Sequence, residues 1–163
     1  MDASTAPTEV AVIGIGNLLL MDEGLGVHAL RELEQEVQSD GVRCIDGGTD
    51  PWSALSAAEG CRGLVLLDAV LGGKTPGEFH RMELEQVEAS DAVMSLHGLS
   101  MFHLVQYEAL LGRSYTETLV LGMEPEVIEP GIGLSERCRR RLPEFVRMAR
   151  AEITAVRERL GPQ

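Results

Sequence analysis

An apolar segment followed at once by a glycine-rich turn and an acidic pair constrains the fold of this chain most strongly. Residues 10–28 read VAVIGIGNLLLMDEGLGVH. Residues 10–14 are apolar enough for a buried strand, and residues 26–37 carry apolar side chains at helical spacing. The sequence therefore predicts a strand, a tight turn and a helix, with Glu23 at the start of the helix, near the positive end of the helix dipole.

The rest of the chain continues this alternation of strands and helices. Further strands are predicted at residues 42–46, 64–67, 78–84 and 118–122. Further helices are predicted at residues 52–59 and 99–111 and from residue 135 onward, with Pro143 breaking or restarting the last helix. Alternating elements of this kind predict the α/β class, here a three-layer α/β/α domain whose central twisted, mostly parallel sheet is flanked by helices.

Length and composition indicate how the chain is divided. Residues 1–9, MDASTAPTE, carry neither a basic nor an apolar region of the kind that opens a signal peptide, so we expect a flexible N-terminal leader. Residues 10–163 are expected to form a single domain, because a chain of 163 residues can bury a sizeable core without a disulfide or a structural metal.

The charge balance narrows the classes of partner. Fourteen Lys and Arg residues face 26 Asp and Glu residues, which gives a formal net charge of −12 and argues against nucleic acid and anionic membranes. No apolar run approaches the roughly 20 residues that a membrane-spanning helix needs. The three cysteines, Cys44, Cys61 and Cys138, lie far apart and predict reduced thiols in a cytoplasmic protein.

Three side chains capable of binding a metal fall at predicted strand ends or helix starts. They are Glu23, Asp68 and His97. Parallel strands bring such positions to one edge of the sheet, where open α/β sheets bind ligands. One imidazole and two carboxylates suit nickel, zinc, iron or cobalt, and they leave coordination positions open for a substrate or water. The spacing therefore predicts a metal-binding site at this edge.

Each of these residues also has a purely structural interpretation. Glu23 could interact only with the helix dipole, Asp68 could cap the next turn, and His97 could be an ordinary loop histidine. Asp46 ends a predicted strand just before Gly47 and Gly48, so it could either contact a substrate at the same edge or form an Asx-type turn. The residues alone leave these alternatives open.

Five separated runs give the chain a family resemblance. In order they are GIGNLLLMDEGLGV, IDGGT, LLDAV, SLHGLS and LVLGMEPEVIEPGIGLS. Together they resemble the hydrogenase maturation endopeptidases, which process the large subunit of nickel-iron hydrogenases, and the likeness extends from Val10 to about Leu160. The resemblance implies a central twisted sheet flanked by helices. It also implies removal of a C-terminal peptide from the large-subunit precursor once nickel has been inserted.

The resemblance assigns expected roles to individual residues. Glu23, Asp68 and His97 would recognise nickel, supplied by the substrate precursor and not held by the protease itself. Asp46 would be the catalytic residue, acting on the substrate near the cleavage point of an aspartic-type endopeptidase. The expected partner is the large-subunit precursor of a nickel-iron hydrogenase. The alternative function is a non-proteolytic nickel-binding hydrogenase assembly protein that uses the same ligands.

Overall fold

The computed structural model describes residues 10–36, 41–83, 94–95 and 98–162, without the side chains of residues 94–95, 98–102 and 104. The predicted leader, residues 1–9, lies outside this part of the chain. The strands are β1 (Val10–Ile15), β2 (Val42–Gly48), β3 (Gly63–Leu71), β4 (Phe79–Glu83), β5 (Met94–Ser95) and β6 (Glu117–Met123). The helices are η1 (Met21–Gly24), α1 (Leu25–Glu36), α2 (Pro51–Ala57), α4 (Gly98–Leu110) and α5 (Glu136–Leu160).

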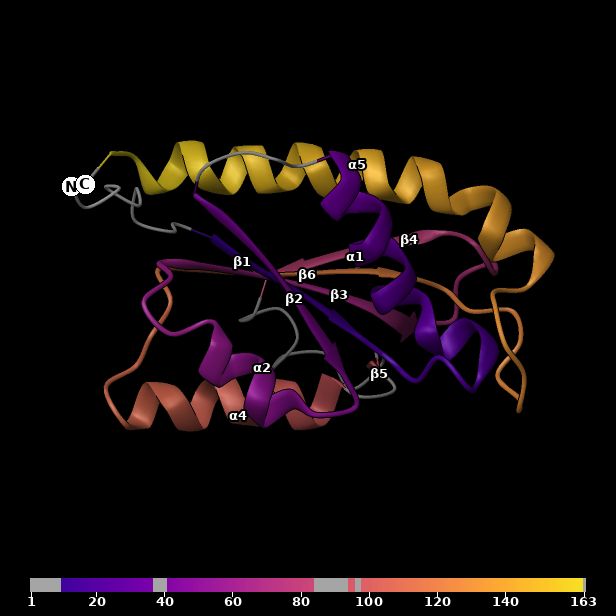
Figure 1. Cartoon of the computed structure of the whole chain (residues 1–163), viewed down its shortest axis with the longest axis horizontal. Coiled ribbons are helices and arrows are strands. Elements are labelled where there is room, and N and C mark those ends of the chain that lie inside the picture. The colour runs from indigo at the N-terminus through magenta and orange to yellow at the C-terminus, as the bar shows by residue number, and fades with distance from the viewer. Residues whose placement is uncertain (1–9, 37–40, 84–93, 96–97, 163) are drawn as a thin grey trace.

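The central sheet has the strand order β2-β1-β3-β6-β4. β1 pairs in parallel with β2 and β3, and β3 pairs in parallel with β6. β4 is antiparallel to β6 and forms one edge of the sheet, and β5 adds a short antiparallel pairing to the end of β3. Figure 1 shows α1 and α5 on one face of the sheet and α2 and α4 on the other. The predicted three-layer, mostly parallel α/β/α fold is confirmed.

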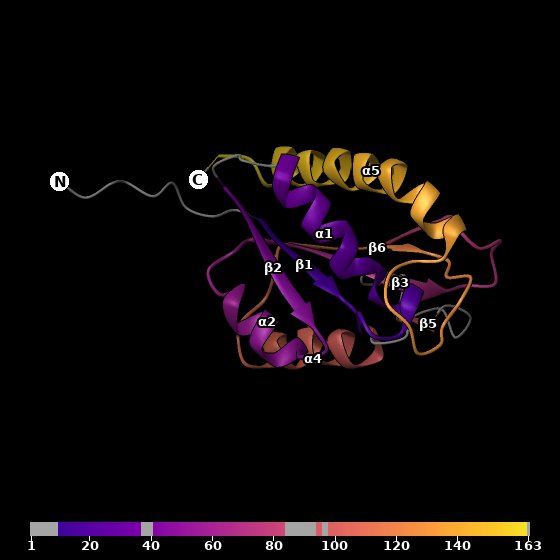
Figure 2. The same ribbon diagram turned by 45° about the vertical axis from the view of Figure 1, so that its right-hand side comes forward.

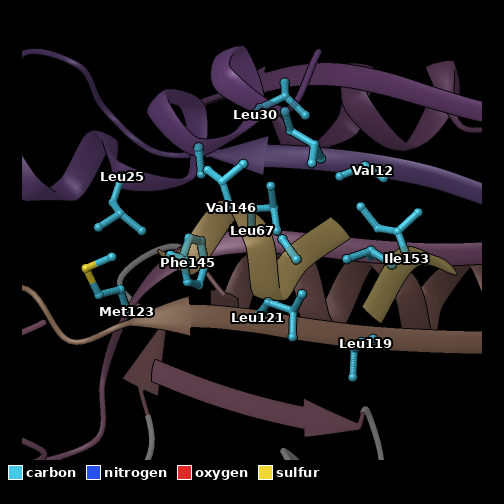
Figure 3. Packing of buried hydrophobic residues seen from close by; sticks show 14 of the residues in the cluster. Val12, Leu25, Leu30, Leu67, Leu119, Leu121, Met123, Phe145, Val146 and Ile153 are labelled. Carbon is cyan, nitrogen blue, oxygen red and sulfur yellow. The ribbon is translucent and has the colours of Figure 1, made fainter. Parts of the chain in front are cut away.

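The core consists of two apolar layers, one on each face of the sheet. The layer under α1 and α5 includes Leu67 of β3 together with Phe145 and Val146 of α5 (Figure 3). The layer under α2 and α4 includes Leu64 and Leu66 of β3. Successive side chains of a strand point to opposite faces, so β3 supplies both layers and is buried on both sides.

The last helix is continuous, and the predicted break at Pro143 is wrong. α5 runs from Glu136 to Leu160 with Pro143 inside it. Proline removes one helical N–H, but Leu142 and Phe145 beside it are buried against the sheet and hold the helix in place on both sides. Within the described part of the chain, no helix combines the length and the apolar character that crossing a bilayer requires.

The central strand β3 is longer than the sequence predicts. We expected the strand to end at Leu67 with Asp68 just beyond it, but β3 continues to Leu71. Asp68 pairs with Gly122 of β6, and Val70 pairs with Ser95 of β5, so partners distant in sequence extend the strand. Asp68 therefore lies inside a strand and not in a turn.

Candidate active site

Glu23 lies at the carboxyl end of β1, in the 3₁₀ turn η1 that leads into α1. The residue is only 9% exposed. Gly16, just after β1, has a φ of +145°, and a Cβ atom there would lie 2.0 Å from the carbonyl oxygen of Glu23. Only a glycine permits this backbone contact. The turn that carries Glu23 is therefore packed directly onto the end of the first strand.

Asp68 lies at the same edge of the sheet and is 1% exposed. A Cβ atom on Gly26, in the first turn of α1, would lie 2.0 Å from the carbonyl oxygen of Leu67, so this turn touches the residue that precedes Asp68. The turn η1 also contacts β3. The structure thus places two buried carboxylates, Glu23 and Asp68, where the start of one helix meets the ends of two strands.

His97 lies outside the described residues, so the predicted three-ligand set remains a prediction. Nearby, Ser95 of β5 pairs with Val70, two residues after Asp68, and α4 begins at Gly98. Among the side chains that the structure describes, no three His, Cys, Asp or Glu residues group closely enough to hold a metal. The metal site that the sequence predicts at this edge includes His97 and so stays a prediction.

Asp46 is half exposed and lies apart from Asp68. Its Oδ1 accepts the Gly48 N–H at 3.1 Å, which is the hydrogen bond of an Asx-type turn, and its Oδ2 lies 3.6 Å from Nη2 of Arg31 in α1. By strand alternation Asp46 faces α1, whereas Asp68 faces the opposite layer. β1 lies between their two strands, so the strand backbones are about 10 Å apart.

Asp22 holds two distant segments of the fold together, a role that the sequence did not indicate. Its side chain is completely buried and accepts three backbone hydrogen bonds, from Glu126 and Val127 at 2.9 Å each and from Ser135 at 2.7 Å. Burial raises the pKa of Asp22, but the hydrogen bonds donated by Val127, Ser135 and Glu126 outweigh it and hold the pKa below its ordinary value. Asp22 is therefore an ionised clamp between η1 and residues 124–135, which lie side by side in Figure 2.

The backbone of the same turn is held in an uncommon conformation. Met21 has a φ of +50°, a region that residues other than glycine rarely adopt. Its N–H donates to the Gly131 carbonyl at 3.2 Å, and the Gly131 N–H donates to the Leu19 carbonyl at 2.9 Å. Residues 124–135 thus fix the turn immediately before Glu23.

Sequence comparisons identify the family of proteins to which this chain is similar. A model of the hydrogenase maturation protease family matches residues 27–152. The chain belongs to this family. It is 34% identical over 145 residues to a hydrogenase expression/formation protein, HupD, of Thiocapsa roseopersicina, covering 86% of this chain and 66% of the relative. It is 32% identical over 129 residues to the hydrogenase 2 maturation protease of Escherichia coli, covering 77% of this chain and 79% of the relative.

A solved structure supports the same assignment. The hydrogenase maturating endopeptidase HybD from E. coli matches with a TM-score of 0.80 at 27% identity, covering 90% of this chain and 93% of that chain. The family that the sequence motifs resemble is thereby confirmed, and so is the assignment of this chain as an enzyme, a protease of hydrogenase maturation.

Another buried carboxylate of this protease, Glu124, holds the segment that follows Asp68. Glu124 accepts hydrogen bonds from the N–H groups of Gly72 and Gly73 at 2.9 and 3.2 Å, and its Oε2 lies 2.7 Å from Nε2 of His80. Burial raises the pKa of Glu124, but the hydrogen bonds from the Gly72 N–H and the His80 ring outweigh it and hold the pKa below its ordinary value. The sequence indicated none of these three contacts, which join residues 44 to 52 positions apart.

The cysteines of this protease do not form a nucleophilic site. All three are free. Burial, reinforced by Glu34, raises the pKa of Cys44 to about 11, and burial raises the pKa of Cys138 to about 11 as well. Thiols with such pKa values are protonated near neutral pH and are poor nucleophiles. The thiols of Cys44 and Cys138 are therefore poor candidates for a nucleophile.

Proposed function

We propose that this protease removes a C-terminal peptide from the nickel-loaded large-subunit precursor of a nickel-iron hydrogenase. In this proposal Glu23, Asp68 and His97 recognise the nickel that the precursor carries. The observation that carries the proposal is the burial of Glu23 and Asp68 at one edge of the sheet, 9% and 1% exposed. Both carboxylates lie toward the carboxyl ends of parallel strands, where open α/β sheets bind ligands.

The donor set fits a metal ion that arrives with the substrate. Two carboxylates and one imidazole are suitable ligands for nickel and leave positions for groups of the precursor that already hold it. Without the cation, two negative side chains would face the precursor, so binding is expected to depend on nickel. The ion would serve as a recognition tag or would also polarise the scissile carbonyl or the attacking water as a Lewis acid.

Asp46 has a separate role in this proposal, as the catalytic carboxylate. It is exposed, its orientation is set by the Gly48 N–H and Arg31, and it lies one strand away from the turn that carries Glu23. An exposed carboxylate at that distance can act on the peptide bond near the nickel site and activate water as a general base. Free thiols and the net charge of −12 are consistent with action in the cytoplasm on a protein precursor.

The deciding experiment compares two forms of one precursor. Purified large-subunit precursor is prepared with and without nickel, incubated with the protease and followed by mass spectrometry and by a binding assay. We expect a C-terminal peptide to be released from the nickel-loaded form alone. Nickel-dependent binding without any mass change would instead identify a non-proteolytic assembly protein. Equal cleavage of both forms would refute nickel recognition.

A further inference from the structure

The two segments joined by the Asp22 clamp expose large apolar side chains. Leu19 is 66% exposed, Ile128 is 41% exposed and Ile132 is 88% exposed. We call these three residues the apolar rim. Single exposed apolar residues are common on protein surfaces, but three of them on two short segments beside a candidate active site indicate a binding surface.

The rim residues come together through backbone pairing. Leu20 and Gly131 form a parallel bridge, and the Gly131 N–H donates to the Leu19 carbonyl at 2.9 Å. The Asp22 N–H donates to the Val127 carbonyl at 3.1 Å. Leu19 is itself one of the paired residues. Ile128 follows the paired residue Val127, and Ile132 follows the paired residue Gly131. The paired backbone continues into Glu23, whose N–H donates to Leu20.

The scaffold beneath the rim is held rigidly. Asp22 accepts three backbone hydrogen bonds from residues 126–135, and Met21 is held in its left-handed conformation by Gly131. A surface that is ordered before binding loses little conformational freedom when a partner docks. Such a surface suits the recognition of a specific segment.

Charge indicates the kind of segment. Glu129 is exposed between Ile128 and Ile132, and the chain as a whole is acidic, with a net charge of −12. A segment with an apolar side chain at its centre and a basic side chain beside it would complement both features.

We propose that the apolar rim docks an apolar segment of the hydrogenase large-subunit precursor, flanked by a basic residue, and so selects the precursor that the protease cleaves. This inference rests on the proposed function, because it assigns substrate selection to the surface that adjoins the proposed nickel site. The occupant is the precursor and not a second copy of this chain, since the rim is continuous with the edge where the precursor must place its metal.

The chain offers a matched control at the opposite edge of the sheet. Leu110 is 84% exposed at the end of α4, in the segment that leads to the first residue of β6. Glu117 of β6 pairs with Gly63, the first residue of β3, so this segment lies at the amino ends of the strands. Leu110→Asp therefore replaces an exposed apolar side chain with a negative charge, as the rim substitutions do, but at the end of the sheet opposite the candidate active site.

The test measures cleavage of the nickel-loaded precursor by wild type, Leu19→Asp, Ile132→Asp, the double variant and Leu110→Asp. We expect each single rim substitution to raise KM about tenfold or more, the size expected when one large apolar contact is lost, with a much smaller change in kcat. Salt screens the attraction between Glu129 and a basic residue of the precursor. Lowering the ionic strength should therefore lower the KM of wild type more than it lowers the KM of Glu129→Gln. Leu110→Asp should keep the wild-type KM.

Three outcomes separate the inference from the proposed function. If wild type does not cleave the loaded precursor, the proposed function fails and the inference falls with it. If wild type cleaves and the folded rim variants keep its KM, the inference is refuted while the proposed function stands. If size-exclusion chromatography shows that the rim variants dissociate a dimer while KM is unchanged, the rim binds a second copy and the inference is refuted. Thermal unfolding confirms that every variant is folded.

Discussion

Asp22 and Glu23 are neighbours in the sequence but belong to two regions that use a buried carboxylate differently. In the clamp region, Asp22 is satisfied by three backbone N–H groups from residues 126–135 and ties a distant loop to the turn. In the candidate-ligand region, Glu23 and Asp68 are buried where α1 meets the carboxyl ends of β1 and β3. Burial alone therefore does not distinguish a structural carboxylate from a candidate ligand. What identifies Asp22 as structural is that it accepts three backbone hydrogen bonds from one distant loop.

The sharpest test of this comparison replaces the candidate ligands with amides of the same shape. Glu23→Gln and Asp68→Asn should each slow processing of the nickel-loaded precursor by more than about 100-fold, because a neutral amide is a far weaker ligand for a cation. The free energy of unfolding should fall by less than it does in Asp22→Asn, because the amide oxygen of Asp68→Asn can still accept the hydrogen bond that the Ala69 N–H donates to Asp68. His97→Ala should reduce processing equally.

Peptide release followed by mass spectrometry and denaturant unfolding give the two measurements. Processing at the wild-type rate in Glu23→Gln or Asp68→Asn would remove that residue from the site. A large loss of stability would instead place it with Asp22 in the clamp region.

Asp46 tests whether a third, exposed carboxylate acts in the chemistry. Asp46→Asn should lower kcat by about 100-fold, as expected for loss of a general base, and should weaken nickel-dependent binding of the precursor much less. Asp50→Asn is the control, because Asp50 is also exposed but caps α2 through the Ser53 N–H. Single-turnover cleavage and a separate binding assay distinguish the two steps. An equal loss in both would argue against a catalytic role for Asp46.

Asp22→Asn should behave in the opposite way to the ligand substitutions. An amide can accept through one oxygen only and turns its NH₂ group toward backbone donors, so we expect the free energy of unfolding to fall by about 2 to 4 kcal/mol. Glu129→Gln removes the same charge from an exposed position of the neighbouring loop and should change stability by less than about 0.5 kcal/mol. Urea unfolding measures both. An unchanged free energy of unfolding in Asp22→Asn would show that Asp22 is not a structural clamp.

The sequence predicted the fold well because local signals agreed with the tertiary structure. Alternating apolar strands and amphipathic helices gave the layers, and the glycine-rich turn gave the position of Glu23. Features set by distant partners were not predicted: β3 extends past Asp68 because β5 and β6 pair with it, and α5 continues through Pro143 because the sheet holds both sides. The Asp22 clamp joins residues 104 to 113 positions apart, which no local pattern encodes.

The pH dependence of stability offers the finest test of the clamp. The pKa of Asp22 is lower in the folded protein than its ordinary value of 3.8, so the ionised carboxylate stabilises the fold above that value, and this contribution is lost as the pH falls through the folded pKa. The stability gap between wild type and Asp22→Asn should therefore be constant near pH 6 and shrink below about pH 4. The pKa of Glu124 is also lowered, but Glu124 is present in both proteins and cancels in the difference. If this difference in the free energy of unfolding stays constant down to pH 3, Asp22 holds residues 124–135 without its negative charge. The clamp would then depend only on the hydrogen-bond geometry of the side chain.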